Sequence, residues 1–125
     1  MTIGSGALTR FPVTWASRVE LPGGKTSPEE LIAAAHAACY SMAFSAELEG
    51  RGAAPEHLDV AAVATIDDDA GDLKISTMEL TVRGKVPGMS EVDFLAAAKA
   101  AGVGCPVSKA LAGNVAVTLD AKLVR

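Results

Sequence analysis

The sequence is poor in large aromatic side chains. They make up 4% of its 125 residues, although half of the residues are hydrophobic. The apolar content therefore comes mainly from Ala, Val and Leu, whose small side chains let helices and strands approach closely but bury little area each. A chain of this length fits one hydrophobic core, and we expect residues 1–125 to form a single domain.

Basic residues are also few. Eleven Lys and Arg stand against fifteen Asp and Glu, which gives a formal net charge of −4. Nucleic-acid-binding domains usually carry a basic face, so this balance argues against that function. Residues 1–8 lack the basic start and apolar run of an export signal, and no segment approaches the roughly 18 consecutive apolar residues of a membrane span. The sequence predicts a cytoplasmic protein without a nucleic-acid or membrane partner.

Cysteine is scarce as well, with only Cys39 and Cys105. Two thiols without an export signal are not expected to form a structural disulfide framework, and a free Cys is often just a small buried hydrophobe. Cys105, however, stands directly before Pro106 at a predicted helix start, where backbone N–H groups favour a thiolate. Cys39 lies among Ala residues and needs a nearby cation or hydrogen-bond donor to ionise. This reasoning alone would choose Cys105 as the nucleophile.

One long helix dominates the predicted structure. Ser27 can cap it, Pro28 suits its first position and Glu30 completes a capping box. From about Pro28 to Glu49 the sequence is apolar on nearly all faces, a pattern typical of a helix buried all round. In a domain this small, a second subunit is a natural way to complete that burial.

The other elements are shorter, and their order indicates the fold class. We expect one or two short strands within residues 4–21, a strand at 58–66, a turn at 67–72, a strand at 73–86, helices at 91–101 and 105–112, and a strand at 115–124. The acidic residues 67–69 lack the spacing of a calcium loop and fit a solvated turn. The sequence predicts an α+β domain with an antiparallel sheet and a long buried central helix.

Two segments resemble the OsmC/Ohr family, namely TSPEELIAAAHAACYSMA at 26–43 and GCPVSKAL at 104–111. The resemblance spans nearly the whole chain, and the run from His36 to Cys39 is similar to the OsmC branch. It implies an intertwined homodimer around two long central helices that reduces hydroperoxides, organic ones or hydrogen peroxide, without a cofactor. It also implies regeneration by a dithiol reductant, typically a lipoyl group. Relatives usually carry an extra N-terminal strand before the region of Ser5.

The resemblance also implies roles for four residues. Cys39 matches the peroxidatic thiol and Cys105 the resolving thiol. The family's catalytic arginine falls on Arg18, which would stabilise the Cys39 thiolate and the departing alkoxide. The family's glutamate falls on Glu29, which would hold the arginine by a charge-assisted hydrogen bond. After peroxide attack, Cys105 would convert the sulfenic acid on Cys39 into a disulfide.

Helix geometry constrains this assignment. Ten residues of straight helix separate Glu29 from Cys39 by about 15 Å, too far for one site within one chain. We therefore expect Glu29, together with Arg18, to come from the other subunit. Arg10 and Arg51 compete with Arg18 for the cationic role.

Two other functions remain open. In a non-enzymatic redox sensor, the disulfide between the two cysteines would alter partner binding. In a metal-binding module, His36 would be a ligand, but two Cys and one His lack a fourth ligand and the paired short spacings of zinc sites. We favour a structural hydrogen bond for His36, and packing roles for Tyr40 and Phe44.

Overall fold

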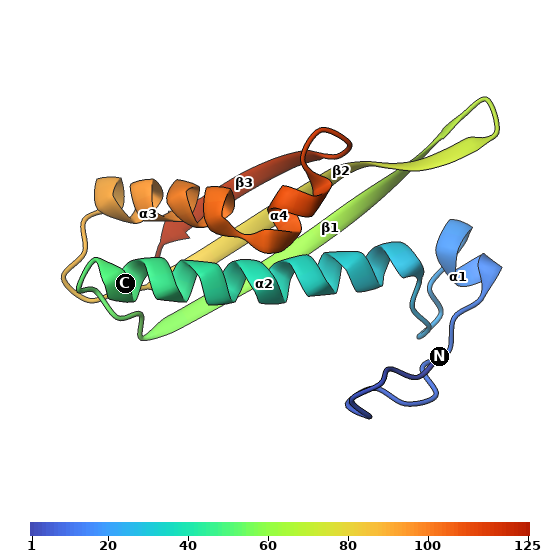
Figure 1. Ribbon diagram of the computed structural model, residues 1–125, viewed down its shortest axis with the longest axis horizontal. Helices are drawn as coiled ribbons and strands as arrows, with labels where there is room; N and C mark the ends of the chain where they lie inside the picture. Colours follow the sequence, from blue (N-terminus) through green and yellow to red (C-terminus); the bar gives the residue numbers. More distant parts are fainter.

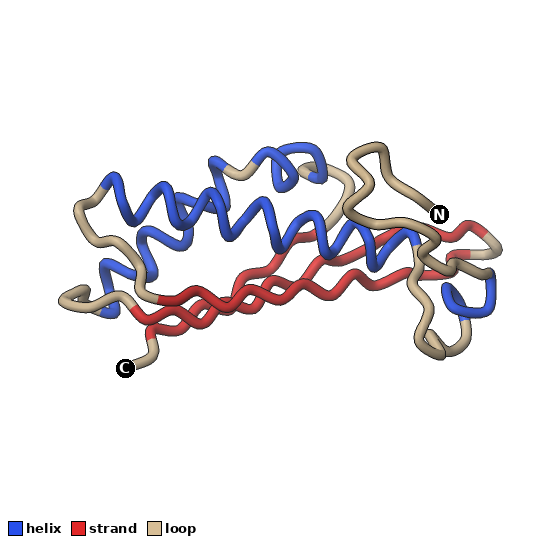
Figure 2. The backbone as a smooth tube through the Cα atoms, turned by 90° about the horizontal axis from the view of Figure 1, so that it is seen from below, coloured by secondary structure: helices blue, strands red, loops and turns tan.

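The structure is a computed structural model that describes residues 1–125. In chain order its elements are α1 (Trp15–Val19), α2 (Pro28–Gly50), β1 (His57–Asp69), β2 (Asp72–Lys85), α3 (Glu91–Gly104), α4 (Pro106–Leu111) and β3 (Ala116–Leu123). Figure 1 shows the long α2 beside α3, and Figure 2 shows α2, α3 and α4 on one side of the strands, with the short α1 apart from them at the end of the sheet. The predicted α+β class is confirmed, with one layer of helices over one sheet.

The sheet has three strands in the order β1-β2-β3. It is a mixed sheet, so the prediction of an antiparallel sheet is wrong. β1 and β2 form an antiparallel hairpin, whereas β3 runs parallel to β2, from Thr77 opposite Ala116 to Gly84 opposite Leu123. A parallel pair requires a long crossover connection, which α3 and α4 supply here. The two helices carry the chain back along the sheet before β3 begins.

The β1–β2 hairpin is tighter than the sequence suggested. The predicted turn at 67–72 is wrong, since β1 continues to Asp69 and pairs it with Asp72. Only Ala70 and Gly71 form the turn, with φ values of 54° and 87°. Positive φ at both central residues is the geometry of a type I′ turn, which matches the twist of the strands on either side.

The N-terminal region contains a short helix where strands were predicted. Thr14 and Ser17 hold the start of α1 by reciprocal side-chain-to-backbone hydrogen bonds of 3.1 and 2.9 Å, which form a capping box. The only strand-like feature is an isolated bridge between Val13 and Thr26. The Ser17 hydroxyl also donates to the Thr26 carbonyl at 2.7 Å. These contacts fix α1 beside the start of α2.

The long helix α2 is buried on one face only, so the prediction of burial all round is wrong for the single chain. Its buried positions are Glu29, Ala33, His36, Tyr40, Phe44 and Leu48. Exposed positions on other faces include Ala34, Ala35, Ala38, Met42 and Ala46. By length and composition α2 could cross a membrane, with a mean hydropathy of 1.2. Its row of buried side chains against the sheet and α3 is the packing of a core helix.

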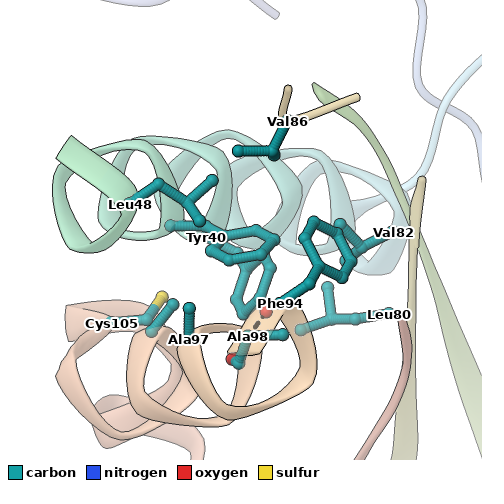
Figure 3. Close-up of a cluster of buried hydrophobic side chains, with 11 residues drawn as sticks. Tyr40, Leu48, Leu80, Val82, Val86, Phe94, Ala97, Ala98 and Cys105 are labelled. Atoms are coloured by element: carbon teal, nitrogen blue, oxygen red, sulfur yellow. Dashed lines mark hydrogen bonds between the residues drawn. The ribbon is translucent and has the colours of Figure 1, made fainter. Parts of the chain in front are cut away.

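Aromatic rings form the centre of the core beneath α2 and α3. The ring centroids of Tyr40 and Phe44 are 5.7 Å apart, and those of Phe44 and Phe94 are 5.1 Å apart, both in tilted arrangements that aromatic pairs favour. The Tyr40 hydroxyl donates to the Ala98 carbonyl at 2.7 Å. Figure 3 shows Cys105 among the side chains of this cluster. One of the two thiols is therefore buried in the hydrophobic core.

Candidate functional site: a pair of thiols

The structure brings Cys39 and Cys105 together across 66 residues of sequence, with their sulfur atoms 3.3 Å apart. Cys39 lies in the middle of α2 and is half-buried, whereas Cys105 is completely buried. Both are free thiols. A disulfide requires an S–S separation of about 2.05 Å, so a small movement suffices to close the bond.

The junction between α3 and α4 positions Cys105. Its N–H closes the last turn of α3 by donating to the Ala101 carbonyl at 2.9 Å. Cys105 is also the residue before α4, and Pro106 sets the first position of that helix. The side chain therefore sits at a corner between two helices, where it faces the middle of α2.

A second contact fixes α4 against α2. The Nε2 atom of His36 lies 2.7 Å from the hydroxyl oxygen of Ser108. His36 is one helical turn before Tyr40 on the buried face of α2, and Ser108 is in the first turn of α4. Sequence reasoning missed Ser108, although a hydroxyl three residues after a cysteine at a helix start is spaced to reach back to it.

The two thiols differ in acidity. Burial raises the pKa of Cys105, but hydrogen bonds from the backbone and side chain of Ser108, from Cys39 and from the Val107 backbone outweigh it, and the pKa is lowered overall. A hydrogen bond from the Val107 backbone lowers the pKa of Cys39, but burial and the neighbouring Cys105 thiol outweigh it, and the pKa is raised overall. Within the single chain Cys105 is the thiol that ionises more readily.

An ion pair between Arg18 and Glu29 stands at the start of α2. The guanidinium Nη2 and Nε atoms lie 2.6 and 2.8 Å from Glu29 Oε1. Glu29 is buried, and its Oε2 atom has no hydrogen-bond partner. The guanidinium carbon also lies 5.4 Å from the ring centroid of Trp15, within the range of a cation–π contact. Arg18 is therefore held in place by two neighbours.

A cleft of about 960 Å³ opens beside this ion pair. It is enclosed by α1, the first turns of α2 and the facing part of the β1–β2 hairpin, and both Arg18 and Glu29 line it. Cys39 does not belong to its lining. The cation and the thiols are thus parts of two separate features within one chain.

The structure does not bring the four predicted site residues together in one chain. It joins Cys39 to Cys105 and Arg18 to Glu29, and helix α2 holds the two pairs about 15 Å apart along its axis. The competing cation Arg51 pairs with Glu47 at 2.9 Å, beyond the far end of the helix.

The other candidates also lie away from the thiols or have other partners. Arg10 is an exposed residue of the N-terminal loop, where its N–H donates to the Thr2 hydroxyl at 3.1 Å. His36 binds Ser108, and no three His, Cys, Asp or Glu side chains are grouped as metal ligands. Residues 67–69 lie on an exposed strand end.

The structure thus places a half-exposed thiol beside a buried one at the junction of α3 and α4, with the two sulfur atoms close enough for a small movement to join them. The chain belongs to the OsmC-like protein family, whose model matches residues 21–120. It is 39% identical over 119 residues to peroxiredoxin OsmC of Escherichia coli, a match that covers 95% of this chain and 81% of the relative. It is 37% identical over 95 residues to the organic hydroperoxide resistance protein OhrA of Bacillus subtilis, covering 76% of this chain and 66% of that protein.

A solved structure has the same fold. The organic hydroperoxide resistance protein OhrB of Bacillus subtilis superposes with a TM-score of 0.77 at 25% sequence identity, covering 97% of this chain and 87% of that one. The helix-over-sheet architecture is thus shared over nearly the whole chain.

Proposed function

We propose that this protein is a thiol-dependent peroxidase that reduces organic hydroperoxides and hydrogen peroxide. The observation that carries the proposal is the 3.3 Å separation between the half-exposed sulfur of Cys39 and the buried sulfur of Cys105. A thiol that reacts with a peroxide becomes a sulfenic acid, and a second thiol in bonding range converts it to a disulfide. The names of the relatives, a peroxiredoxin and organic hydroperoxide resistance proteins, support the same chemistry.

The reaction begins when the Cys39 thiolate attacks the distal oxygen of the hydroperoxide. The O–O bond breaks, an alkoxide leaves and takes up a proton as the alcohol, and Cys39 becomes a sulfenic acid. Cys105 then attacks that sulfur, so that a disulfide forms and water departs. A dithiol reductant of the lipoyl type returns both residues to thiols by exchange through a mixed disulfide.

The first step needs a cation beside Cys39, because the pKa of this thiol is raised in the single chain. We infer that a second copy supplies Arg18, held by Glu29, in an intertwined homodimer. Two antiparallel α2 helices related by a two-fold axis bring Glu29 of one opposite Cys39 of the other when they cross at Ala34, which is midway between them. Ala34 is exposed and small, as such a crossing requires.

Turnover with an alkyl hydroperoxide tests the proposal. Purified protein is given cumene hydroperoxide and excess dihydrolipoamide, and peroxide loss is followed. Wild type should sustain turnover, Cys39→Ser should abolish it, and Cys105→Ser should leave a trappable sulfenic acid on Cys39. Ser41→Ala is a matched control, since the Ser41 hydroxyl bonds only the Ala37 carbonyl of its own helix.

The alternatives give different results. A redox sensor would oxidise once to the disulfide without sustained consumption of peroxide. Full activity in Cys39→Ser would show that the sulfur of Cys39 is not the reacting atom, and the proposal would then be wrong.

A further inference from the structure

His36 is a buried titratable residue that the peroxide chemistry above does not use. Its side chain is completely buried, its Nε2 atom lies 2.7 Å from the Ser108 hydroxyl oxygen, and its Nδ1 atom has no partner. A polar group is rarely buried in this way without a reason, because an unsatisfied buried nitrogen destabilises the fold. The position of Ser108 supplies a reason.

Ser108 links His36 to the resolving thiol. It follows Cys105 by three residues in the first turn of α4, the spacing at which a hydroxyl reaches back to the residue before the helix, and its backbone and hydroxyl lower the pKa of Cys105. Cys105 in turn lies 3.3 Å from Cys39. The order of these contacts places four side chains in one line, from a buried imidazole through a hydroxyl to the two sulfur atoms, and the step from Ser108 to Cys105 is the one that the proposal below adds.

The protonation state of His36 decides which way this line is oriented. Burial lowers the pKa of His36, so the ring is neutral at neutral pH and carries one proton. If that proton is on Nε2, it is donated to the Ser108 oxygen, and the hydroxyl proton of Ser108 is free to point at the Cys105 sulfur. If it is on Nδ1, Ser108 must donate to Nε2 and cannot donate to Cys105. Only the first arrangement stabilises a thiolate.

We propose that His36 is a positioning residue for the resolving thiol: its Nε2–H fixes the Ser108 hydroxyl so that the hydroxyl donates to the Cys105 thiolate. This proposal rests on the peroxidase function proposed above. The step it assists is the attack of the Cys105 thiolate on the sulfur of the Cys39 sulfenic acid. The S–S bond forms, the S–O bond breaks, and the leaving oxygen takes up the proton released by Cys105 and departs as water.

The same hydrogen bond acts when the disulfide is reduced. An incoming thiolate reaches the half-exposed sulfur of Cys39 more easily than the buried sulfur of Cys105. Cys105 is then the leaving group, and a thiol of lower pKa leaves faster. The mixed disulfide with the reductant therefore forms on Cys39, and Ser108 stabilises the departing sulfur.

A purely structural role is the competing explanation, because the contact of His36 with Ser108 also docks α4 on α2. Such a role predicts lower stability in the variants but no change in the acidity of Cys105. The pKa of Cys105 therefore separates the two explanations, and it can be measured without any peroxidase activity.

The first experiment measures that pKa in a Cys39→Ser background, where Cys105 is the only thiol of the chain. Thiolate absorbance in the ultraviolet is followed against pH, which requires no reagent to reach the buried sulfur. Ser108→Ala removes a charge-assisted hydrogen bond from the thiolate and should therefore raise the pKa of Cys105 by about one to two units. His36→Leu should act in the same direction, and His36→Gln, which retains an N–H near the position of Nε2, should restore most of the shift.

Two features of the chain make this titration clean. Tyr40 is its single tyrosine, and burial raises the pKa of that phenol well above the range of thiols. Ser41→Ala removes a hydroxyl from α2 that touches neither sulfur, and it should leave the pKa of Cys105 unchanged. An unchanged pKa in both Ser108→Ala and His36→Leu would overturn the proposal.

The second experiment separates the two chemical steps in the full enzyme by rapid mixing with peroxide. Ser108→Ala should form the sulfenic acid on Cys39 at the wild-type rate and close the disulfide more slowly. A higher pKa lowers the thiolate fraction of Cys105 but raises the intrinsic nucleophilicity of that thiolate. The two effects partly cancel, so the rate of disulfide closure should fall about three- to fifteenfold. Absence of any sulfenic acid in wild type would defeat the peroxidase function, whereas normal disulfide closure in Ser108→Ala would defeat only the role of His36.

Discussion

Mixed dimers test whether the catalytic site is shared between two chains. One chain carries Cys39→Ser and keeps Arg18, and the other carries Arg18→Ala and keeps Cys39. Each variant alone should be inactive as a homodimer, since every site lacks either the reacting sulfur or the cation. When the two are mixed, a heterodimer contains one site with both groups and one site with neither.

The structure gives the magnitude that decides the outcome. Along α2, the ion pair of Arg18 with Glu29 is about 15 Å from Cys39. Through water, a unit charge at that distance stabilises the thiolate by only about 0.3 kcal/mol, which lowers its pKa by about 0.2 units. A guanidinium from a partner at about 4 Å near a protein surface contributes up to about 4 kcal/mol, or about three units. Only the second value can bring a thiol from about 8.5 to about 6.

The assay is peroxide consumption after the two inactive variants are unfolded together, refolded as an equal mixture and supplied with dihydrolipoamide. Random pairing gives half heterodimers, each with one working site, so about a quarter of wild-type activity should return. Mixing the folded variants without exchange is the control, and it should remain inactive. If the refolded mixture also stays inactive while wild type recovers, Arg18 and Cys39 do not come from different chains.

The remaining predictions concern the stability of the fold. Gly84→Ala should lower the free energy of unfolding, measured in urea, by about 1–3 kcal/mol, because an added Cβ would lie 2.7 Å from the Phe94 ring. Gly50→Ala is its control and should not destabilise the protein, because a Cβ added there has no atom within 4 Å. Burial lowers the pKa of His36, so below about pH 6.5 the unfolded chain binds a proton that the folded chain does not, and stability falls as pH decreases toward the folded pKa. His36→Gln should flatten this part of the stability profile, and an unchanged profile would contradict the burial of a neutral ring.

Local signals in the sequence predicted the elements that local chemistry controls. The start of α2 follows from Ser27, whose hydroxyl accepts from the Glu30 N–H at 3.1 Å, and from Pro28 at the first position. The start of α1 depends on the same chemistry at Thr14 and Ser17, yet the alternating side chains there indicated a strand. The capping pair spans only the four residues from Thr14 to Ser17, and the alternation of side chains, which the fold does not use, outweighed it in the prediction.

Long-range features could not be predicted in the same way. The direction of β3 depends on how far α3 and α4 carry the chain before the strand begins. No pattern within the strand itself contains that information, so the prediction of an antiparallel sheet was wrong. The 3.3 Å contact between Cys39 and Cys105 spans 66 residues and was expected only through the family resemblance. Ser108 was missed because its partners, an imidazole and a sulfur, become neighbours only when α4 docks on α2.

The rigidity of α2 connects the composition of the chain to its chemistry. A loop between Glu29 and Cys39 could fold back and bring Arg18 to the sulfur within one chain, but ten residues of continuous helix cannot. In the function proposed above, the cation for Cys39 therefore arrives from a second copy, across a helix face where Ala34, Ala35 and Ala38 are exposed. Large side chains at these positions would hold Arg18 of the second copy away from the thiol. The scarcity of aromatic residues and the abundance of Ala are therefore what such a helix contact requires.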